Sequence, residues 1–278
     1  MDISVVIPCF ADSNIFSLLN LLDKDSNNII REYIVVLVGE HSSDFIKKLK
    51  NASKQKIVIK RVEPGNISTS FNTGIGASQS NKILILNSDL VGISKDYLKR
   101  VIKLSKKYDV VKSDIIFAKN DGFFSNTISK SRTMGHINMA YNPGILVDMR
   151  VFKSIGFFNE KVHFSEDAEF DSRLKKSKFT FFFDKKSYIT HPSISPTKDL
   201  KMAFNIGRGK YQSVKYAGAK DNEGFISVIK RLITLTQIRY FIREAKEWGF
   251  DTAIYDIFWF LFYYLGNYKE RFIQYGKK

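Results

Sequence analysis

The feature that most constrains the fold is a series of short apolar runs that recur through the first 90 residues. These runs span Ile3–Ile7, Tyr33–Val38, Ile57–Val62 and Lys82–Leu86. They lack the alternation of polar and apolar side chains, which is typical of strands buried on both faces. The segments between them show helical spacing and span Asn14–Leu22, Phe45–Leu49 and Ser68–Ser80. Strands that alternate with helices predict an α/β fold, a Rossmann-like and mostly parallel sheet with helices on both faces.

The pattern is less regular after residue 90. Further strands are predicted over Val110–Phe117, Gly144–Val147, Phe179–Phe183 and Tyr188–Thr190. The segment Asn120–Ser131 is rich in Gly, Ser and Asn, so we predict a mobile loop there.

The last third of the chain is helical, basic and aromatic in pattern. The two long predicted helices are Lys230–Trp248 and Thr252–Phe272. Pro192 and Pro196 interrupt the chain before this part, which indicates a domain boundary near residue 195. We therefore expect an α/β domain over residues 1–195, with halves of about 1–90 and 91–195, and a C-terminal helical extension over 196–278.

The charge balance indicates an anionic partner. The chain has 44 basic and 28 acidic residues, a formal net charge of +16. Nucleic acid, phosphorylated metabolites and acidic membranes all suit this charge. No basic, secretory-type segment precedes Ile3–Ile7, and Phe258–Leu265 is shorter than the roughly 20 apolar residues that span a bilayer. We expect a cytoplasmic protein. Peripheral binding to the inner face of the cell membrane is compatible with this location.

Polar residues follow the predicted strands at the edge where such sheets bind ligands. Pro8 and Phe10 end the first strand, Glu40 follows the second, and Asn87-Ser88-Asp89 follows the fourth. A carboxylate such as Asp89 can hold a divalent cation against phosphate oxygens, and Glu40 can accept hydrogen bonds from a base or ribose. Ordinary solvated turns also contain such residues, so each motif alone leaves both interpretations open.

An acidic cluster follows further along the chain. Glu166, Asp167, Glu169 and Asp171 fall within six residues, and Arg173 is the base nearest to them. On a helix, Glu166, Glu169 and Arg173 share a face, while Asp167 points elsewhere. Acids at a helix start are stabilised by the helix dipole, and such a cluster also offers one carboxylate as a general base.

Taken in order, seven segments resemble the family 2 nucleotide-sugar glycosyltransferases, which have the GT-A fold. The segments are Ser4–Phe10, Val38–Asp44, Phe71–Ala77, Asn87–Asp89, Asn142–Gly144, Gly156–Glu160 and Phe164–Phe170. The resemblance runs from Ile3 to about His191, roughly two thirds of the chain. Each motif is short, but their order and spacing match the family.

The resemblance implies an inverting enzyme that moves a sugar from a nucleoside-diphosphate sugar to a hydroxyl of a glycan or lipid-linked acceptor. Asp167 would be the general base, and Glu166 would orient the base or the acceptor. The implied donor-binding residues are Pro8, Phe10, Glu40, Asn72, Asn87, Ser88 and Arg208, the last in a basic loop over the diphosphate. Asp89, with His191, would bind the divalent cation, Mn²⁺ or Mg²⁺.

The sequence departs from the family pattern at two positions. Gly39 replaces the first acid of the second-strand motif, and Asn87 replaces the first Asp of Asp-x-Asp. Only Asp89 can then bind metal as an anion there, so either the metal affinity is low or His191 completes the site. Imidazole suits manganese better than magnesium. The processive Gln-x-x-Arg-Trp signature is absent, so processive polymer synthesis is not expected.

Several alternatives remain at this point. Asn87 also fits an inactive nucleotide-sugar-binding relative, and the +16 charge fits a nucleic-acid-binding protein, although no nucleic-acid-reading motif is present. A nucleotidyltransferase shares the doubly wound sheet but does not explain Glu166-Asp167. The basic-aromatic extension is expected to pack as core, to anchor at an anionic membrane surface, or to form an oligomer interface.

Overall fold

The computed structural model describes residues 2–10, 14–26, 28–119, 122–134, 139–140, 142–217 and 235–275. The chain forms two compact units. The first, called here the sheet unit, comprises Met1–Ile116, His136–Glu160 and Asp167–Pro192. The second, called the helical unit, comprises Phe117–Gly135, Lys161–Glu166 and Ser193–Lys278. The helical unit therefore includes two segments that precede residue 195.

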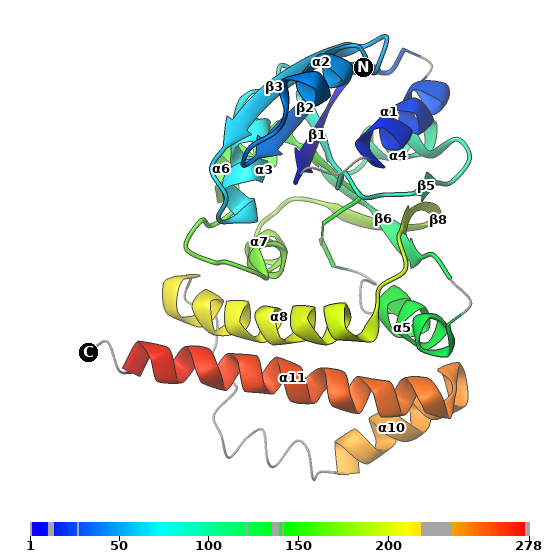
Figure 1. The fold of residues 1–278 in the computed structure, drawn as a ribbon, viewed down its shortest axis with the longest axis vertical. Helices are drawn as coiled ribbons and strands as arrows, with labels where there is room; N and C mark the ends of the chain where they lie inside the picture. Colours follow the sequence, from blue (N-terminus) through cyan, green and yellow to red (C-terminus); the bar gives the residue numbers. More distant parts are fainter. Residues whose placement is uncertain are drawn as a thin grey trace. The chain divides into compact units, whose positions relative to one another are not determined.

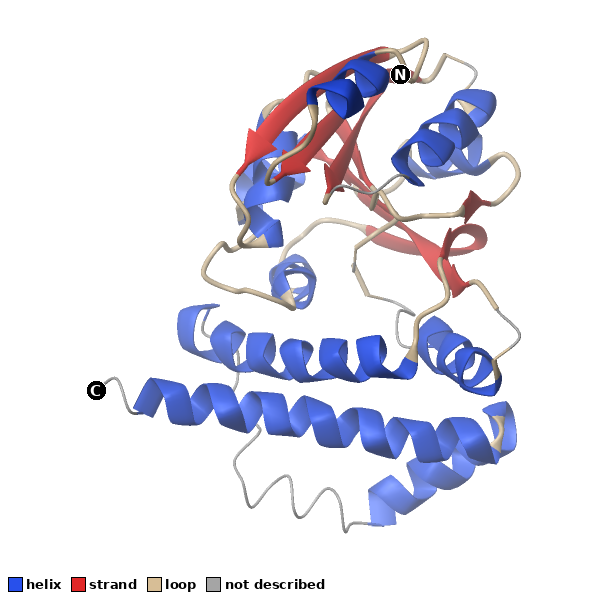
Figure 2. Ribbon diagram, in the orientation of Figure 1, coloured by secondary structure: helices blue, strands red, loops and turns tan. Residues whose placement is uncertain are grey.

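The sheet unit is built on one eight-stranded sheet in the order β3-β2-β1-β4-β7-β6-β8-β5 (Figures 1 and 2). Its strands are β1 Ile3–Cys9, β2 Ile30–Val38, β3 Lys56–Val62, β4 Lys82–Ile85, β5 Gly92–Ile93, β6 Val110–Phe117, β7 Ile145–Asp148 and β8 Phe181–His191. Strands β3, β2, β1 and β4 are parallel neighbours, whereas β7 runs antiparallel to β4 and β6, and β5 antiparallel to β8. The predicted Rossmann-like α/β class is confirmed.

One strand replaces two short ones that the sequence predicted. Strand β8 runs unbroken from Phe181 to His191, across the polar residues that separate Phe179–Phe183 from Tyr188–Thr190. Asp184 in its middle is buried, and Arg100 compensates the buried charge by donating two hydrogen bonds to its carboxylate, one of them 2.8 Å long. The polar stretch thus has a partner inside the fold, and the strand continues through it.

Helices cover both faces of this sheet. On one face lie α3 (Ile67–Gly76), α6 (Met149–Ile155) and α7 (Glu166–Lys175), whose Phe71, Phe152 and Phe170 pack against strand residues such as Val6 and Val36. Figure 1 shows α1 (Asn14–Asp25) and α4 (Tyr97–Ser105) together on the opposite side. Helix α2 (Ser43–Lys50) contains the predicted segment Phe45–Leu49, and the Ser42 hydroxyl caps its start by accepting from the Phe45 N–H at 3.2 Å.

The helical unit consists of α5 (Phe123–Met134), α8 (Pro196–Ala217), α10 (Leu235–Trp248) and α11 (Phe250–Tyr275). Helices α8 and α11 lie side by side, and glycines let their backbones approach closely (Figure 1). A Cβ on Gly207 would lie 1.8 Å from the Tyr263 carbonyl oxygen, and one on Gly266 would lie 1.9 Å from that of Phe204. The predicted helical extension is confirmed for residues 196–217 and 235–275, and residues 218–234 lie outside the described part.

The loop predicted over Asn120–Ser131 is wrong for its described residues, which form α5 from Phe123 onward. Two of the buried hydroxyl groups of α5 bond to α11. Thr127 Oγ1 donates to Asp251 Oδ2 at 2.6 Å, and the Ser131 hydroxyl donates to Asp256. The polar side chains of this segment therefore serve a contact between two helices. Composition alone does not distinguish such a segment from a solvated loop.

Part of the aromatic extension is core. The Arg132 guanidinium lies 3.0 Å from Asp256 and 3.5 Å from Asp199, and it stacks 4.4 Å from the Trp259 ring centre. The Tyr255 hydroxyl donates to Asp199 at 2.9 Å, and burial raises the pKa of this phenol.

Among the described residues, no helix is both long and apolar enough to span a bilayer.

Candidate active site

The predicted site residues of three neighbouring strands lie along one edge of the sheet. Because β2, β1 and β4 are adjacent and parallel, their carboxyl ends meet at the same edge. Glu40 is exposed just after β2, the Phe10 ring is 52% exposed just after β1, and Asn87 follows β4. Pro8 is buried within β1, opposite Val36 of β2.

Asp89 and His191, the two predicted metal ligands, are brought together in the same unit. Oδ2 of Asp89 lies 3.3 Å from Nε2 of His191. The pairing of β5 with β8 causes this, because the Val91 N–H donates to the Thr190 carbonyl at 2.9 Å. Each site residue is then one or two positions from that hydrogen bond.

The other ring nitrogen determines what His191 presents to Asp89. Nδ1 lies 3.2 Å from the carbonyl oxygen of Pro192, which can only accept, so this contact is a hydrogen bond in the form of the ring that carries a hydrogen on Nδ1. In the neutral imidazole, Nε2 then directs a lone pair at the Asp89 carboxylate. Two acceptors face each other at 3.3 Å, and such a contact is favourable only with a proton or a cation between them.

Two further oxygen atoms at this edge lack hydrogen-bond partners. Oδ1 of Asp89 and Oδ1 of Asn87 are both buried without a partner among the residues that the structure describes. A carboxylate, an imidazole and an amide oxygen are together a suitable donor set for a divalent cation. No cluster of three His, Cys, Asp or Glu side chains that could hold a metal ion occurs in the described part of the chain.

Asp167 differs from the other acids of its cluster. Glu169 pairs with Arg173 at 2.7 Å and Asp171 with Lys175 at 2.6 Å. Asp167 instead accepts two backbone N–H groups, from Ala168 at 2.8 Å and from Asn142 at 3.3 Å, and it forms no ion pair with another described residue.

The surroundings of Asp167 change its acidity. Burial raises the pKa of its carboxyl to about 6, and the nearby charge of Asp171 acts in the same direction. The backbone of Gly144, two residues after Asn142, donates to the Ile85 carbonyl at 2.9 Å. This connects the Asp167 contact to the end of β4, the strand that leads into Asn87.

Lys112 is a charged residue near Asp167 that the sequence reasoning missed. It lies on β6, fully buried, and its Nζ donates to the Ser113 carbonyl. Burial lowers the pKa of this lysine to about 7, while the carboxylates of Asp114 and Asp167 act in the opposite direction. The available sequence signal was a lone lysine inside the apolar run Val110–Phe117.

The chain approaches Glu166 through a strained turn. Phe164 and Ser165 have φ of 71° and 64°, the left-handed region that bulky side chains avoid. Helix α8 holds this turn within the helical unit. The Ser165 hydroxyl donates to the Ile206 carbonyl at 3.1 Å, and a Cβ on Gly209 would lie 1.8 Å from the Phe164 carbonyl oxygen. Glu166, predicted beside the base, is buried at the first position of α7.

Two other predicted donor-binding residues have protein partners. The Asn72 amide donates to the Phe158 carbonyl at 2.9 Å and to Glu160 at 2.8 Å, and its oxygen accepts from the Phe158 N–H at 3.0 Å. Arg208 donates to Glu270 at 2.9 Å. The basic loop expected around Arg208 is wrong, because Gly207 and Gly209 lie within α8 and serve close backbone contacts instead.

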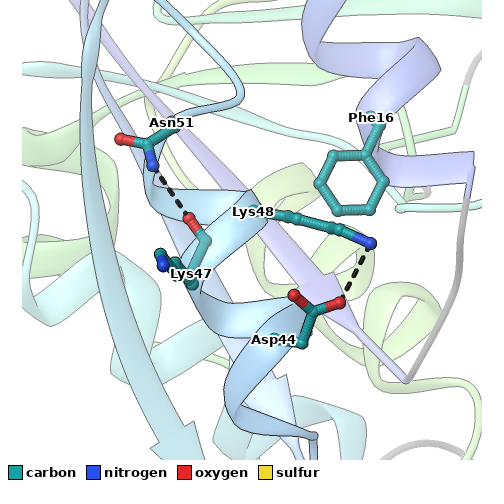
Figure 3. A pocket seen from close by; sticks show the side chains of 5 residues that line it. All are labelled: Phe16, Asp44, Lys47, Lys48 and Asn51. Atoms are coloured by element: carbon teal, nitrogen blue, oxygen red, sulfur yellow. Dashed lines mark hydrogen bonds and ion pairs between the residues drawn. The ribbon is translucent and has the colours of Figure 1, made fainter.

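A separate, open hollow of about 480 Å³ lies on the sheet unit beside α1 and α2 (Figure 3). It is lined by Phe16, Asp44, Lys47, Lys48 and Asn51. Its polar groups bond to one another, since Lys48 pairs with Asp44 at 2.9 Å and Asn51 donates to the Lys47 carbonyl at 3.2 Å. None of the predicted site residues lines it, so we place the candidate site at the strand ends.

Comparisons with known proteins bear on the fold. No family model and no curated protein matches this sequence. The structure is similar to that of S. aureus TarS, a glycosyltransferase, with a TM-score of 0.51 and 15% sequence identity. The match covers 97% of this chain and 55% of TarS, so the chain spans about half the length of that protein. The chain thus shares its fold with this part of TarS.

Proposed function

We propose that this protein is an inverting glycosyltransferase that moves a sugar from a nucleoside-diphosphate sugar to a hydroxyl of a glycan or lipid-linked acceptor. The observation that carries the proposal is the meeting of Asp89 and His191 at the carboxyl end of the sheet, with the Asn87 oxygen nearby in the chain. The fold similarity to TarS supports it.

Asp167 is the proposed general base. Its pKa of about 6 leaves it ionised near neutral pH and still basic enough to take a proton from the acceptor hydroxyl. That oxygen forms a bond to the anomeric carbon as the bond to the diphosphate breaks, and the electron pair leaves on a phosphate oxygen. One displacement inverts the anomeric configuration, and the diphosphate needs no second carboxyl group to protonate it.

Asp89, His191 and Asn87 are the residues that would hold the divalent cation. When bound, such an ion neutralises the negative charge that develops on a diphosphate leaving group. A hydrogen bond from Nδ1 to the Pro192 carbonyl would hold the imidazole in the tautomer that presents Nε2 to the ligand. With one carboxylate and one imidazole, this donor set favours Mn²⁺ over Mg²⁺. Glu40 and the exposed Phe10 ring are the proposed contacts to the nucleoside.

A thermal-shift experiment tests the donor class. A ligand that binds only the folded state raises the melting temperature by mass action. We expect one nucleoside diphosphate to give a shift with Mn²⁺ that EDTA removes. Asp89→Ala should remove this shift and His191→Ala should reduce it, whereas Glu247→Ala, an exposed acid on α10, should keep it. No shift with any nucleotide, or equal shifts with and without EDTA, would contradict the proposal.

A second candidate, an inactive sugar-nucleotide-binding relative, is favoured by Asn87 alone. It makes the same prediction for binding and the opposite one for turnover. Release of nucleoside diphosphate from the donor, in the presence of a mixture of glycan and lipid-linked acceptors, distinguishes the two candidates. Turnover that depends on Asp167 supports the enzyme, and metal-dependent binding without any release supports the relative.

A further inference from the structure

The solvent-facing side of α11 is apolar along most of its length. Its exposed large apolar residues include a set that is here called the α11 stripe: Phe250, Ile254, Ile257, Phe258, Leu261, Leu265 and Phe272. Ile273 is also exposed and lies outside this set. Their spacing of three, four and seven residues places them on one side of the helix. The side chains are between 38% and 76% exposed, and the stripe is roughly 33 Å long at 1.5 Å per residue.

The opposite side of α11 is already occupied within the helical unit. Tyr255 bonds to Asp199, and the Asn267 amide donates to the Gly207 carbonyl at 3.2 Å, both on α8. The stripe is therefore not the core-facing side of this helix. A soluble helix normally places polar residues on its solvent side, so a continuous apolar stripe indicates an interaction surface.

The surface charge of the helical unit indicates which partner fits. By sequence the unit has 19 Lys and Arg residues against 10 Asp and Glu. Five of the acids, Glu166, Asp199, Glu244, Asp256 and Glu270, are buried. Among the described residues of this unit, the exposed basic side chains are Lys119, Lys130, Lys161, Lys198, Lys201, Lys215, Arg243, Lys246 and Lys269, and the exposed acid is Glu247.

We propose that the helical unit docks through the α11 stripe on an anionic membrane surface. The stripe would lie at the boundary of head groups and acyl chains, with the exposed lysines contacting lipid phosphates. A second copy of the chain fits less well, because two strongly basic surfaces would then repel each other. Helix α11, with 26 residues, has the length of many helices that lie in the plane of a membrane interface.

Vesicle sedimentation tests this docking. The full chain is mixed with vesicles of phosphatidylcholine alone or of phosphatidylcholine with phosphatidylglycerol, at low and high salt. We expect binding to the anionic vesicles only, and weaker binding at high salt. Phe258→Ala and Leu261→Ala should each weaken it about tenfold or more, and the double variant should remove it. Met202→Ala, an exposed apolar residue on α8 outside the stripe, is the matched control and should bind as the parent does.

Three outcomes would overturn the proposal. They are no binding of the parent to anionic vesicles, equal binding by the double variant, and a parent dimer in light scattering that the double variant converts to monomer. The last result would assign the stripe to a second copy of the chain. The proposal does not depend on the sugar donor, because the double variant should keep the nucleotide-dependent thermal shift. Loss of vesicle binding and failure of the proposed enzymatic function are therefore distinguishable.

Discussion

Nε2 of His191 lies 3.3 Å from Oδ2 of Asp89, and Nδ1 of the same ring is held by the Pro192 carbonyl. The two residues are far apart in the sequence, and the antiparallel pairing of β5 with β8 joins them. In the proposed metal site a cation would lie between these two side chains, and the unpartnered Asn87 oxygen would add a neutral donor. This relationship makes the proposed metal site testable through its charge.

Restoring the missing carboxylate should strengthen metal binding. In Asn87→Asp we expect roughly tenfold tighter binding of Mn²⁺ or Mg²⁺, because a second anionic oxygen joins Asp89. Calorimetric titration with each metal measures this affinity. Asn51→Asp, at the C-cap of α2, changes the net charge equally and should leave the affinity unchanged. Equal or weaker metal binding by Asn87→Asp would show that position 87 does not contact the ion.

Replacing the proposed base should abolish transfer while sparing the donor. In Asp167→Asn we expect a loss of about 10²- to 10⁴-fold in turnover, because the amide cannot take the acceptor proton. The donor-dependent thermal shift should persist. Asp171→Asn removes an acid one turn later that bonds to the Ala140 N–H and pairs with Lys175. This control variant should retain most turnover. Retained turnover in Asp167→Asn would exclude Asp167 as the base.

The raised pKa of Asp167 predicts a pH dependence. Turnover should fall as the pH drops below about 6, because the base becomes protonated. The same shift affects stability. The folded state holds this proton more tightly than the unfolded chain, so the contribution of Asp167 to stability falls as the pH rises from about 4 to about 6. Urea unfolding at pH 7 should find Asp167→Asn more stable than the parent, and a less stable variant would contradict this.

Lys112 should influence the same titration. Its ammonium lies in a buried site near Asp167, so its removal should raise the pKa of Asp167 and move the acid limb of the pH–rate profile upward. Because burial lowers the pKa of the lysine to about 7, the unfolded chain binds its proton more tightly, and the parent gains stability as the pH rises from about 7 to about 10. Lys112→Met should therefore stabilise the protein, most strongly below pH 7. An unchanged pH–rate profile in Lys112→Met would show that Lys112 does not affect the titration of Asp167.

Close packing at Gly209 should control the turn before Glu166. A Cβ there would meet the Phe164 carbonyl oxygen at 1.8 Å, so Gly209→Ala should lower the free energy of unfolding by about 1–3 kcal/mol and reduce turnover. Gly76→Ala is the matched control, since its Cβ would meet nothing within 4 Å at the end of α3. Thermal unfolding and turnover of both variants check this. Equal stability of the two variants would show that α8 does not restrain the turn.

The sequence by itself determined most of the strands, several of the helices and the position of the strand-end motifs. These features depend on local periodicity and on turn and cap residues such as Ser42, which act over a few positions of the chain. The Asn120–Ser131 loop was predicted wrongly because the partners of the Thr127 and Ser131 hydroxyl groups lie on α11, far away in the sequence. The loop predicted around Gly207 and Gly209 was wrong for a similar reason. The backbones that these glycines approach are distant in the chain.

Only the tertiary structure decided which polar groups meet. It brought His191 to Asp89 and separated Asp167 from the ion pairs of its neighbours. It also buried Lys112 near that carboxylate, and this burial lowers the pKa of the lysine. A pKa, a tautomer or an unpartnered oxygen depends on the distances and burial that long-range packing creates. A sequence lists the groups that can titrate or bind, and the fold determines their surroundings.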